Sequence, residues 1–414
     1  MFCVINLALW LEWNEQRFYF LGKIVAKSKK ENYNNSCITP IYQNAAYFFE
    51  STEQAIQYHQ GQANLGRYGR YDSPNWLEFE SRIAAFDNYE NALVFSSGMN
   101  AITTTVFSLI EPKDRVIYTG KCYRNIRKFF DFVLPKWGVE TIPIDPMVRD
   151  DFDREFEEQY QGNAKIIFLE MPSNPHLYLV DLAKIKSQLG SDTLLIVDST
   201  LSTPCNLQPQ KFGADLTIHS CSKYIGGHGD ILAGSVAGSR ELIEKIRTYR
   251  NITGGIAAPH STFLLNRSLD TLEIRMKHFN EAGMKVAKYL QAHPGVKTVF
   301  YTGLESHPHF SLAQKYLKGH GGVISFELLD ADIKVTSKFV DALQVPFMGT
   351  NFGASHAMVE QCSVFTYYNL SPAERQEIGI SDSLVRLSIG YENSDLIIED
   401  LDQALRKVGL LQKY

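Results

Sequence analysis

The chain has 414 residues, of which 44% are hydrophobic, so it can bury a large core and form about two or three domains of ordinary size. Its formal net charge is -5 and its Lys and Arg residues are scattered, which argues against nucleic acid as a partner. The six cysteines lie far apart without a CxxC pair, so they predict neither a zinc site nor a disulfide framework. A reducing cytoplasmic location fits this cysteine usage best.

The first residues, MFCVINLALWLEW, form an apolar run that is too short to span a bilayer. The run has neither a basic start nor a small-residue cleavage site, so we interpret it as an arm or an over-long start and expect no membrane partner. Polar runs such as SKKENYNNS interrupt every periodic pattern up to about residue 60. Residues 1–60 are therefore predicted to form an irregular N-terminal arm.

Short apolar runs alternate with helix-like segments between residues 75 and 240. The runs are ALVFSS, DRVIYT, AKIIFLE, TLLIVDST, DLTIHS and ILAGSVAG. Such runs suit strands that are buried on both faces, which predicts an α/β fold with a mostly parallel sheet and helices on both sides. Later segments such as GGVISFELL and SLVRLSIG, with a terminal helix, predict a smaller α+β domain. We place a large domain at 61–275 and a small domain at 276–414.

A lysine stands at the end of one predicted strand, in DLTIHSCSKYIGGHGD. Ser220 and Ser222 flank the approach to Lys223, and a glycine-rich turn follows it. A lysine placed this way can reach inward to form an imine, while its hydroxyl neighbours bind phosphate oxygens. The alternative is a surface lysine in a turn, since most lysines are solvated.

Two further strand ends carry groups that complement such a lysine. Asp198 ends the apolar strand LLIVD, where a buried carboxylate needs a partner such as a protonated pyridine nitrogen; the alternative is a cap for the next helix. In ALVFSSGMN, Gly98 permits close approach to free N–H groups at a helix start, which suits an anion, although an ordinary turn has the same pattern. Neither GxGxxG nor GxxxxGK[ST] is found at a strand-to-helix turn.

Three more segments combine cationic groups with aromatic or apolar surroundings. In RYGRYDSPN, Tyr68 and Arg70 could grip a phosphate dianion, and in KCYRNIRK, Tyr123 could stack on a planar ring. Taken alone, either patch is more often a solvated or interface surface. Arg386 lies within the apolar SLVRLSIG, where its partner is either the α-carboxylate of an amino-acid substrate or a buried structural acid.

These segments, in this order, resemble the Cys/Met-metabolism family of pyridoxal-phosphate enzymes, which includes cystathionine synthases and lyases, methionine γ-lyase and homoserine sulfhydrylases. SCSKYIGGHGD is similar to the family's HS[AT]TKYxxGHxD, and EMPSNP is similar to its ETPSNP. The resemblance runs from about Pro40 to the C-terminus. It implies a fold-type I transferase fold, pyridoxal 5'-phosphate as cofactor, and a homo-oligomer that is at least a dimer and usually a tetramer.

The resemblance also implies roles for the matching residues. Those implied to hold the cofactor are Tyr68, Arg70, Ser97, Gly98, Met99, Tyr123, Asn174, Asp198, Ser220, Ser222 and Lys223. Of these, Lys223 is the implied imine lysine and proton shuttle, and Tyr123 is a stacking ring and a candidate base. Tyr68 and Arg70 are implied to reach the phosphate across a dimer interface. Arg386 is implied to take the substrate carboxylate, helped by Thr350.

Departures from the family pattern bear on the substrate. Enzymes of the family that handle cystathionine place acidic residues where this chain has Arg67 and Gly349, so cystathionine is not the expected substrate. Lys128 matches a family arginine that faces the distal end of the substrate. With Arg67 and Arg124, it favours an anionic leaving group, such as a succinyl or phosphoryl ester of homoserine.

The expected reaction is a γ-replacement or γ-elimination on a sulfur amino acid or an O-activated homoserine. The main alternative is a β- or γ-lyase of cysteine, cystathionine or methionine-type substrates. A methionine γ-lyase is not favoured, because the cysteine that follows the stacking tyrosine in those enzymes is missing and Cys122 precedes Tyr123 instead. Transamination on the same fold, and a non-catalytic scaffold, are further alternatives.

Overall fold

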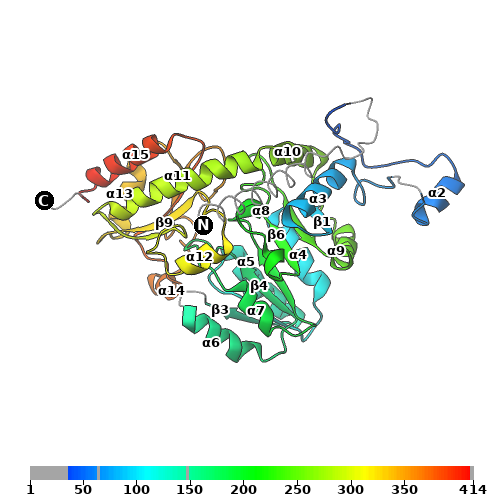
Figure 1. The fold of residues 1–414 in the computed structure, drawn as a ribbon, viewed down its shortest axis with the longest axis horizontal. Coiled ribbons are helices and arrows are strands. Elements are labelled where there is room, and N and C mark those ends of the chain that lie inside the picture. The colour runs from blue at the N-terminus through cyan, green and yellow to red at the C-terminus, as the bar shows by residue number, and fades with distance from the viewer. Residues whose placement is uncertain (1–35, 63–65, 146–148, 411–414) are drawn as a thin grey trace, which may run out of the picture.

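The computed structural model describes residues 36–62, 66–145 and 149–410, so most of the predicted arm lies outside the described residues. Two sheets organise the chain, one of seven strands and one of five. All strands of the seven-stranded sheet lie between residues 91 and 238, and all those of the five-stranded sheet lie between 296 and 388. Figure 1 shows the two sheets in separate halves of the body.

The seven-stranded sheet has the order β1-β7-β6-β5-β4-β2-β3. Its strands are β1 (Asn91–Phe95), β2 (Arg115–Thr119), β3 (Glu140–Ile144), β4 (Ile166–Glu170), β5 (Leu194–Asp198), β6 (Leu216–His219) and β7 (Gly234–Gly238). β7 is antiparallel to both neighbours, and the strands from β3 to β6 pair in parallel. The predicted mostly parallel sheet is therefore confirmed. The prediction missed β3, because its sequence ETIPI is partly exposed and lacks a continuous apolar run.

Helices cover both faces of this sheet. They include α3 (Pro74–Asp87), α4 (Gly98–Leu109), α5 (Arg124–Lys128), α6 (Arg149–Tyr160), α7 (Leu182–Gln188), α8 (Thr203–Asn206) and α9 (Arg240–Thr253). Neighbouring residues of one strand pack into different apolar clusters, as Ile166 and Ile167 do on β4. This burial on both faces explains why the strands read as continuous apolar runs.

The five-stranded sheet has the order β10-β11-β12-β9-β8. Its strands are β8 (Val296–Phe300), β9 (Val323–Leu328), β10 (Phe347–Met348), β11 (Met358–Gln361) and β12 (Leu384–Ser388). The later helices are α10 (Pro259–Leu269), α11 (Leu272–Ala292), α12 (Phe310–Tyr316), α13 (Ile333–Ala342), α14 (Pro372–Glu377) and α15 (Ser394–Lys407), of which α10 packs against α3 and α12 packs against the seven-stranded sheet. α11, α13 and α15 pack together on one face of the sheet (Figure 1). The predicted boundary at 275 falls inside α11, and the division into domains stays a prediction.

One helix stands apart from the body. α2 (Thr52–His59) begins where Ser51 accepts a hydrogen bond from the Gln54 N–H at 3.1 Å, and none of its residues is buried. Figure 1 shows it projecting away from the sheets. The prediction of an irregular arm is wrong for this stretch. In the sequence of α2, only the serine N-cap indicates a helix. The apolar stripe by which the other helices were predicted is missing.

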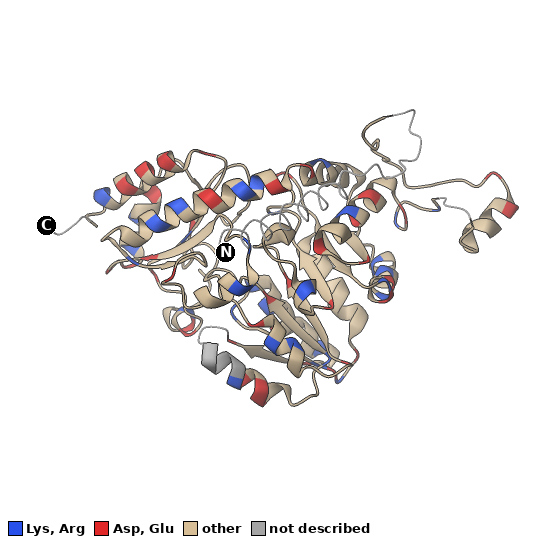
Figure 2. Ribbon diagram, in the orientation of Figure 1, with Lys and Arg blue, Asp and Glu red and all other residues tan. Residues whose placement is uncertain are grey.

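Charged side chains of both signs are interspersed over the surface. Figure 2 shows residues of both signs along α11, whereas on α15 the acidic residues come first and Arg406 and Lys407 lie in the last turn. Among the helices that the structure describes, none combines the length and apolarity needed to cross a bilayer.

Candidate active site

Lys223 lies in the turn that follows β6, at the carboxyl end of the parallel strands. Its Nζ donates a hydrogen bond to Asn351 Oδ1 and lies 4.8 Å from the centre of the Phe352 ring. Burial, and then the positive charge of Arg386, lower the pKa of Lys223 to about 8. The side chain is therefore not a solvated surface lysine, and its neutral, nucleophilic form is accessible near neutral pH.

Asp198 ends β5, the strand beside β6, and is 5% exposed. The N–H and the hydroxyl of Thr200 both donate to Oδ1, at 3.0 and 2.6 Å. Among the described residues, none donates to Oδ2. Burial raises the pKa of this carboxyl. Asp198 therefore fits a buried cation that approaches its free oxygen.

The start of α4 faces the turn after β6. Ser97 caps the helix by accepting from the Asn100 N–H at 3.1 Å, and no described residue accepts from the N–H groups of Gly98 and Met99. A Cβ at position 98 would lie 2.7 Å from Ser220 Cβ, so only glycine allows this approach. The two segments together form a cradle of donors suited to a phosphate.

Hydroxyl groups connect this cradle to Asp198. The Ser220 N–H donates to Thr200 Oγ1 at 2.8 Å, and the same hydroxyl donates to Asp198. Ser222 Oγ accepts from the Ala233 N–H at 3.1 Å, which fixes the turn to the start of β7. We did not single out Thr200 from the sequence, although a hydroxyl two residues after a strand-end acid was a usable signal.

Arg386 lies in the middle of β12 and forms an ion pair with Glu360 on β11 at 3.0 Å. The two side chains are 5% and 1% exposed. Arg386 also donates to Asn174 Oδ1 at 3.0 Å and to the Thr350 carbonyl at 2.8 Å. The structural ion pair that was the alternative for Arg386 is thus present. The sequence analysis missed Glu360, although a charge inside the run MVEQ opposite another buried charge was informative.

Glu170, at the end of β4, is a second acid that the sequence analysis quoted without a role. Its carboxylate accepts from the Tyr123 N–H at 2.8 Å and from the Asn174 N–H at 2.6 Å. Burial, and then the neighbouring Asp198, raise the pKa of Glu170 to about 8. Glu170 thereby anchors Tyr123 and Asn174 at the same sheet edge as Asp198, its partner in the strand register.

The loop before β11 contributes differently from the prediction. The Thr350 side chain is exposed, and this residue meets Arg386 through its carbonyl oxygen. The side chain that contacts Lys223 belongs to the next residue, Asn351. Gly349, where an acid was expected in cystathionine-handling enzymes, lies at the start of this loop.

The structure does not bring Arg67, Tyr68 and Arg70, which lie between α2 and α3, to Lys223. Arg70 donates to the Asn251 carbonyl of α9, and its guanidinium lies over the rings of Tyr68 and Tyr71 at 5.7 and 4.8 Å. Arg67 is exposed over the ring of Tyr71. No hydrogen bond or ion pair between described residues joins these two arginines and two tyrosines to the turn after β6.

Arg124 and Lys128, the cations expected near the distal end of the substrate, lie at the start and the end of α5. Arg124 Nη1 donates to the Thr366 carbonyl at 2.8 Å, and Lys128 is exposed one turn further on. Both therefore lie on the helix that begins directly after Tyr123, while Arg67 lies between α2 and α3.

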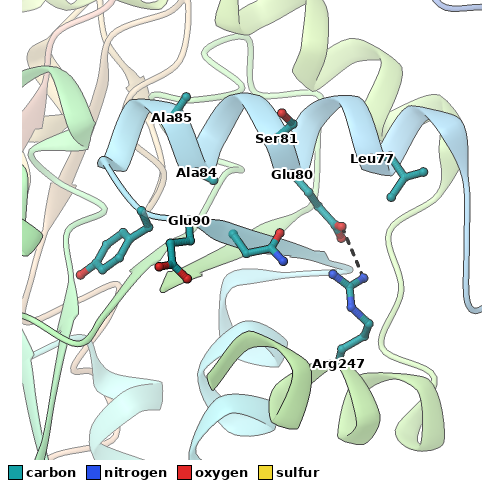
Figure 3. A pocket seen from close by; sticks show the side chains of 9 residues that line it. Leu77, Glu80, Ser81, Ala84, Ala85, Glu90 and Arg247 are labelled. Atoms are coloured by element: carbon teal, nitrogen blue, oxygen red, sulfur yellow. Dashed lines mark ion pairs between the residues drawn. The ribbon is translucent and has the colours of Figure 1, made fainter. Parts of the chain in front are cut away.

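Two surface pockets lie outside the candidate site. One of about 440 Å³ lies between α3, β1 and α9, where Glu80 and Arg247 approach to 3.6 Å (Figure 3). Another of about 390 Å³ is lined by residues that include Arg67 and Asn251. Neither contains Lys223 or Asp198. Within the part of the chain that the structure describes, no group of three His, Cys, Asp or Glu side chains could hold a metal ion.

The family model described as Cys/Met metabolism PLP-dependent enzyme matches residues 22–406. The chain belongs to this family. The enzyme is 36% identical over 373 residues to cystathionine gamma-synthase 1 of Nicotiana tabacum, covering 89% of this chain and 68% of that protein. It is 36% identical to a probable cystathionine gamma-synthase 2 of Arabidopsis thaliana, covering 94% of both. It is 33% identical to an L-methionine gamma-lyase of Fusobacterium nucleatum, covering 95% of this chain and 100% of that protein.

Solved structures show the same fold. A crystal structure of metB from Corynebacterium glutamicum has a TM-score of 0.85 at 29% identity and covers 94% of this chain and 98% of that chain. One of cystathionine gamma-lyase from Lactobacillus plantarum complexed with L-serine has a TM-score of 0.81 at 32% identity, covering 89% and 93%. The enzyme is thus a fold-type I pyridoxal-phosphate enzyme of Cys/Met metabolism, as the motifs predicted.

The residues present fit the cofactor. Asp198 offers a buried carboxylate oxygen without a partner among the described residues, which a protonated ring nitrogen would match. The start of α4 offers two N–H groups that also lack acceptors there, and Gly98 permits the approach of the turn that carries Ser220. Lys223, which is partly buried, lies in the same turn.

Proposed function

We propose that the enzyme catalyses a γ-replacement on an O-activated homoserine whose activating group is an anionic ester, such as a phosphoryl or succinyl group. The observation that carries the proposal is the convergence of Lys223, Asp198 and Arg386 from β6, β5 and β12, all partly or fully buried. They offer an amine, an acid and a guanidinium, which an α-amino acid and a pyridine cofactor require. The relatives named cystathionine gamma-synthase support replacement.

Each part of the cofactor would have its own set of residues. Lys223 would carry it covalently, Asp198 would keep its ring nitrogen protonated, and Tyr123 would stack on its ring with Asn174 near the ring hydroxyl. The phosphate would be held by Ser97, Gly98, Met99, Ser220 and Ser222. When bound, pyridoxal phosphate supplies an electron sink for negative charge that develops at the substrate Cα.

The chain's own residues would then bind the substrate and move protons. Arg386 would hold the α-carboxylate through charge-assisted hydrogen bonds. Lys223, with its pKa near 8, can accept a proton from Cα as the neutral amine and return it as the ammonium. Tyr123 is the candidate second base. Its hydroxyl accepts a hydrogen bond from Asn125 Nδ2 at 3.1 Å, and its side chain is partly exposed.

The distal end of the substrate would lie toward α5. Lys128 has no hydrogen bond or ion pair with another described residue and is exposed, so its charge is available to an anionic leaving group. Arg124 lies one turn earlier and keeps N–H groups beyond the one that it donates to Thr366. Arg67 would add a third cation only if the arm of a neighbouring subunit carries it here.

A panel of O-phospho-, O-succinyl- and O-acetyl-homoserine tests the leaving group. Each ester is given with and without cysteine, and the released group and the products are measured by mass spectrometry. We expect cysteine-dependent turnover with kcat/KM for the charged esters at least about tenfold above that for the neutral acetyl ester. Equal activity on the acetyl ester would remove the basis for an anionic leaving group.

Lys128→Met sharpens this test, because it removes the charge and keeps the length of the side chain. We expect kcat/KM for the phosphoryl and succinyl esters to fall about tenfold and that for the acetyl ester to stay. Lys136→Met is a matched control, since Lys136 is also exposed and lies in the same connection after α5. If cysteine changes neither rate nor product, and a keto acid is released, the enzyme is a lyase, which the methionine gamma-lyase relatives support.

We also propose that the working enzyme is a homo-oligomer of at least two subunits in the cytosol. Tyr68 and Arg70 would complete the phosphate site of a neighbouring subunit. The support is that both residues match family phosphate ligands and that, within one chain, their contacts lead away from Lys223. Sedimentation at working concentration should give a dimer or larger species.

A further inference from the structure

The guanidinium of Arg386 is engaged along one side. Nη1 donates to Asn174 Oδ1 at 3.0 Å and forms an ion pair with Glu360 Oε1, which lies at the same distance. Nη2 donates to the Thr350 carbonyl at 2.8 Å and keeps one N–H. Nε makes no hydrogen bond to any residue that the structure describes. The N–H groups still available therefore lie on the Nε and Nη2 side.

Glu360 is held so that it cannot swing away from this arginine. The antiparallel register of β11 and β12 places it directly opposite Arg386. Its second oxygen, Oε2, accepts from the Thr366 hydroxyl at 2.8 Å, and the Thr366 carbonyl accepts from Arg124 Nη1 at the same distance. Both carboxylate oxygens are therefore fixed, one to Arg386 and one toward α5.

The other acceptor for Nη1 is also fixed. The Asn174 N–H donates to Glu170, and the other oxygen of Glu170 accepts from the Tyr123 N–H. Both paths from Arg386 thus end at neighbouring residues, Tyr123 and Arg124, at the start of α5. Hydrogen bonds on both paths, the ion pair of Arg386 with Glu360, and the peptide bond between Tyr123 and Arg124 therefore link the two sheets.

We propose that Glu360 is a positioning residue that selects the edge of Arg386 presented to the substrate. By holding Nη1, it leaves Nε and Nη2 as the pair that receives the α-carboxylate of the amino acid. The inference rests on the proposed function of Arg386 as the carboxylate site. Glu360 itself does not touch the substrate, and its effect passes through the orientation of the guanidinium.

A second role for Glu360 makes an opposite prediction. If Glu360 acted only as a counter-charge, its removal would leave Arg386 with an uncompensated charge and would strengthen binding of the carboxylate. If it positions Arg386, removal of the acceptor weakens that binding, and a neutral acceptor of the same shape preserves it. Glu360→Ala and Glu360→Gln therefore separate the two roles.

The probe is a pair of ligands without a leaving group, L-norvaline and L-norvalinamide, which differ in the carboxylate. Their dissociation constants are measured by calorimetry on the holoenzyme, and the preference for norvaline is the ratio of the two. We expect Glu360→Ala to reduce this preference about tenfold and Glu360→Gln to leave it equal to or above the wild-type value. KM for a turned-over substrate should rise in Glu360→Ala by a larger factor than kcat falls.

Glu327→Gln is the matched control. Glu327 lies on β9, the other neighbour of β12, and contacts Lys297 at 3.3 Å and the Ser381 hydroxyl at 2.6 Å. We expect the Glu327→Gln variant to show the same preference for norvaline over norvalinamide as the wild type. A higher preference in Glu360→Ala, or an unchanged one, overturns the positioning role.

A further variant keeps the test decisive if Glu360→Ala does not fold. Thr366→Val removes the hydroxyl that fixes Glu360 Oε2 at nearly constant volume, and we expect it to reduce the preference about threefold. An unchanged preference there contradicts the proposal. Because the two ligands need no turnover, the result stays informative whichever ester the enzyme uses, and a failure of the ester panel leaves it standing.

Discussion

Two regions of the molecule carry the predicted cofactor ligands, and they differ in how completely one chain satisfies them. The strand-end cluster, which comprises Glu170, Asp198, Ser220, Ser222 and Lys223, is buried or partly buried, and Thr200 links Asp198 to Ser220 by hydrogen bonds. The arm segment, residues 36–72, contains a helix without a buried residue and leaves Tyr68 43% exposed. The comparison indicates that one chain assembles the chemistry, whereas the arm presents groups whose proposed target lies on another subunit.

The largest effect should come from the strand-end cluster. Lys223→Ala removes both the attachment point and the proton carrier, so we expect kcat to fall at least about 10³-fold. Absorbance near the visible edge should be lost with it, and borohydride treatment of the wild type should leave a vitamin B6 adduct on the peptide that contains Lys223. An unmodified Lys223 peptide would contradict the proposed function as a whole.

Asp198→Asn should have the next largest effect. Asparagine keeps the shape but cannot stabilise a protonated ring nitrogen, so we expect kcat to fall about 10²-fold. Because burial raises the pKa of Asp198, its ionised form is costly in the cofactor-free protein, and the variant should not lower the melting temperature of that protein. A large drop in that temperature would instead favour a structural role as the cap of the following turn.

The arm segment should respond more weakly and in a distinguishable way. Arg70→Ala removes a proposed phosphate ligand, and we expect about a tenfold loss of cofactor affinity. Co-expression with Lys223→Ala then tests whether sites are shared. A mixed dimer would hold one site with both Lys223 and an intact arm from the partner, so random pairing should restore about one quarter of wild-type activity at a cofactor concentration too low to load Arg70→Ala alone. If the co-expressed proteins are no more active than the sum of the two variants measured separately, Arg70 acts in the cofactor site of its own subunit.

The same comparison shows what sequence reasoning could reach in the fold. Strands buried on both faces produce unbroken apolar runs, which is why six strands of the seven-stranded sheet were predicted. The partly exposed edge strand β3 and the solvated helix α2 lack such runs and were missed. Their signals are a weak alternation and a single serine cap, and either pattern also occurs in loops.

The site divides in the same way. Lys223 and Asp198 stand at strand ends, where adjacent parallel strands bring them together, so their proximity follows from the order of the elements. Glu360 and Asn351 could not be found in this way. They depend on the register of β11 against β12 and on the course of the loop between β10 and β11, which brings Asn351 to Lys223, and both are tertiary properties.

The smallest expected effect concerns stability in acid, and it separates a buried pair of histidines from the exposed arm segment. His176 follows the motif that holds Asn174, and its carbonyl lies 3.1 Å from Nε2 of His307, beyond β8. Burial lowers the pKa of both imidazoles to about 4. The folded protein thus keeps them neutral, while the unfolded chain takes up protons below its ordinary value near 6.5.

The sign follows from these pKa values. The two histidines do not oppose folding above about pH 6.5, and stability is lost as the pH falls from there toward 4, where the folded state begins to protonate as well. We therefore expect the melting temperature to decline between pH 7 and pH 4.5, and His307→Gln to make this decline shallower. His59→Gln, in the exposed arm helix, is the control and should keep the wild-type slope. If the melting temperature falls equally steeply with pH in all three proteins, the contact between His176 and His307 does not limit stability in acid.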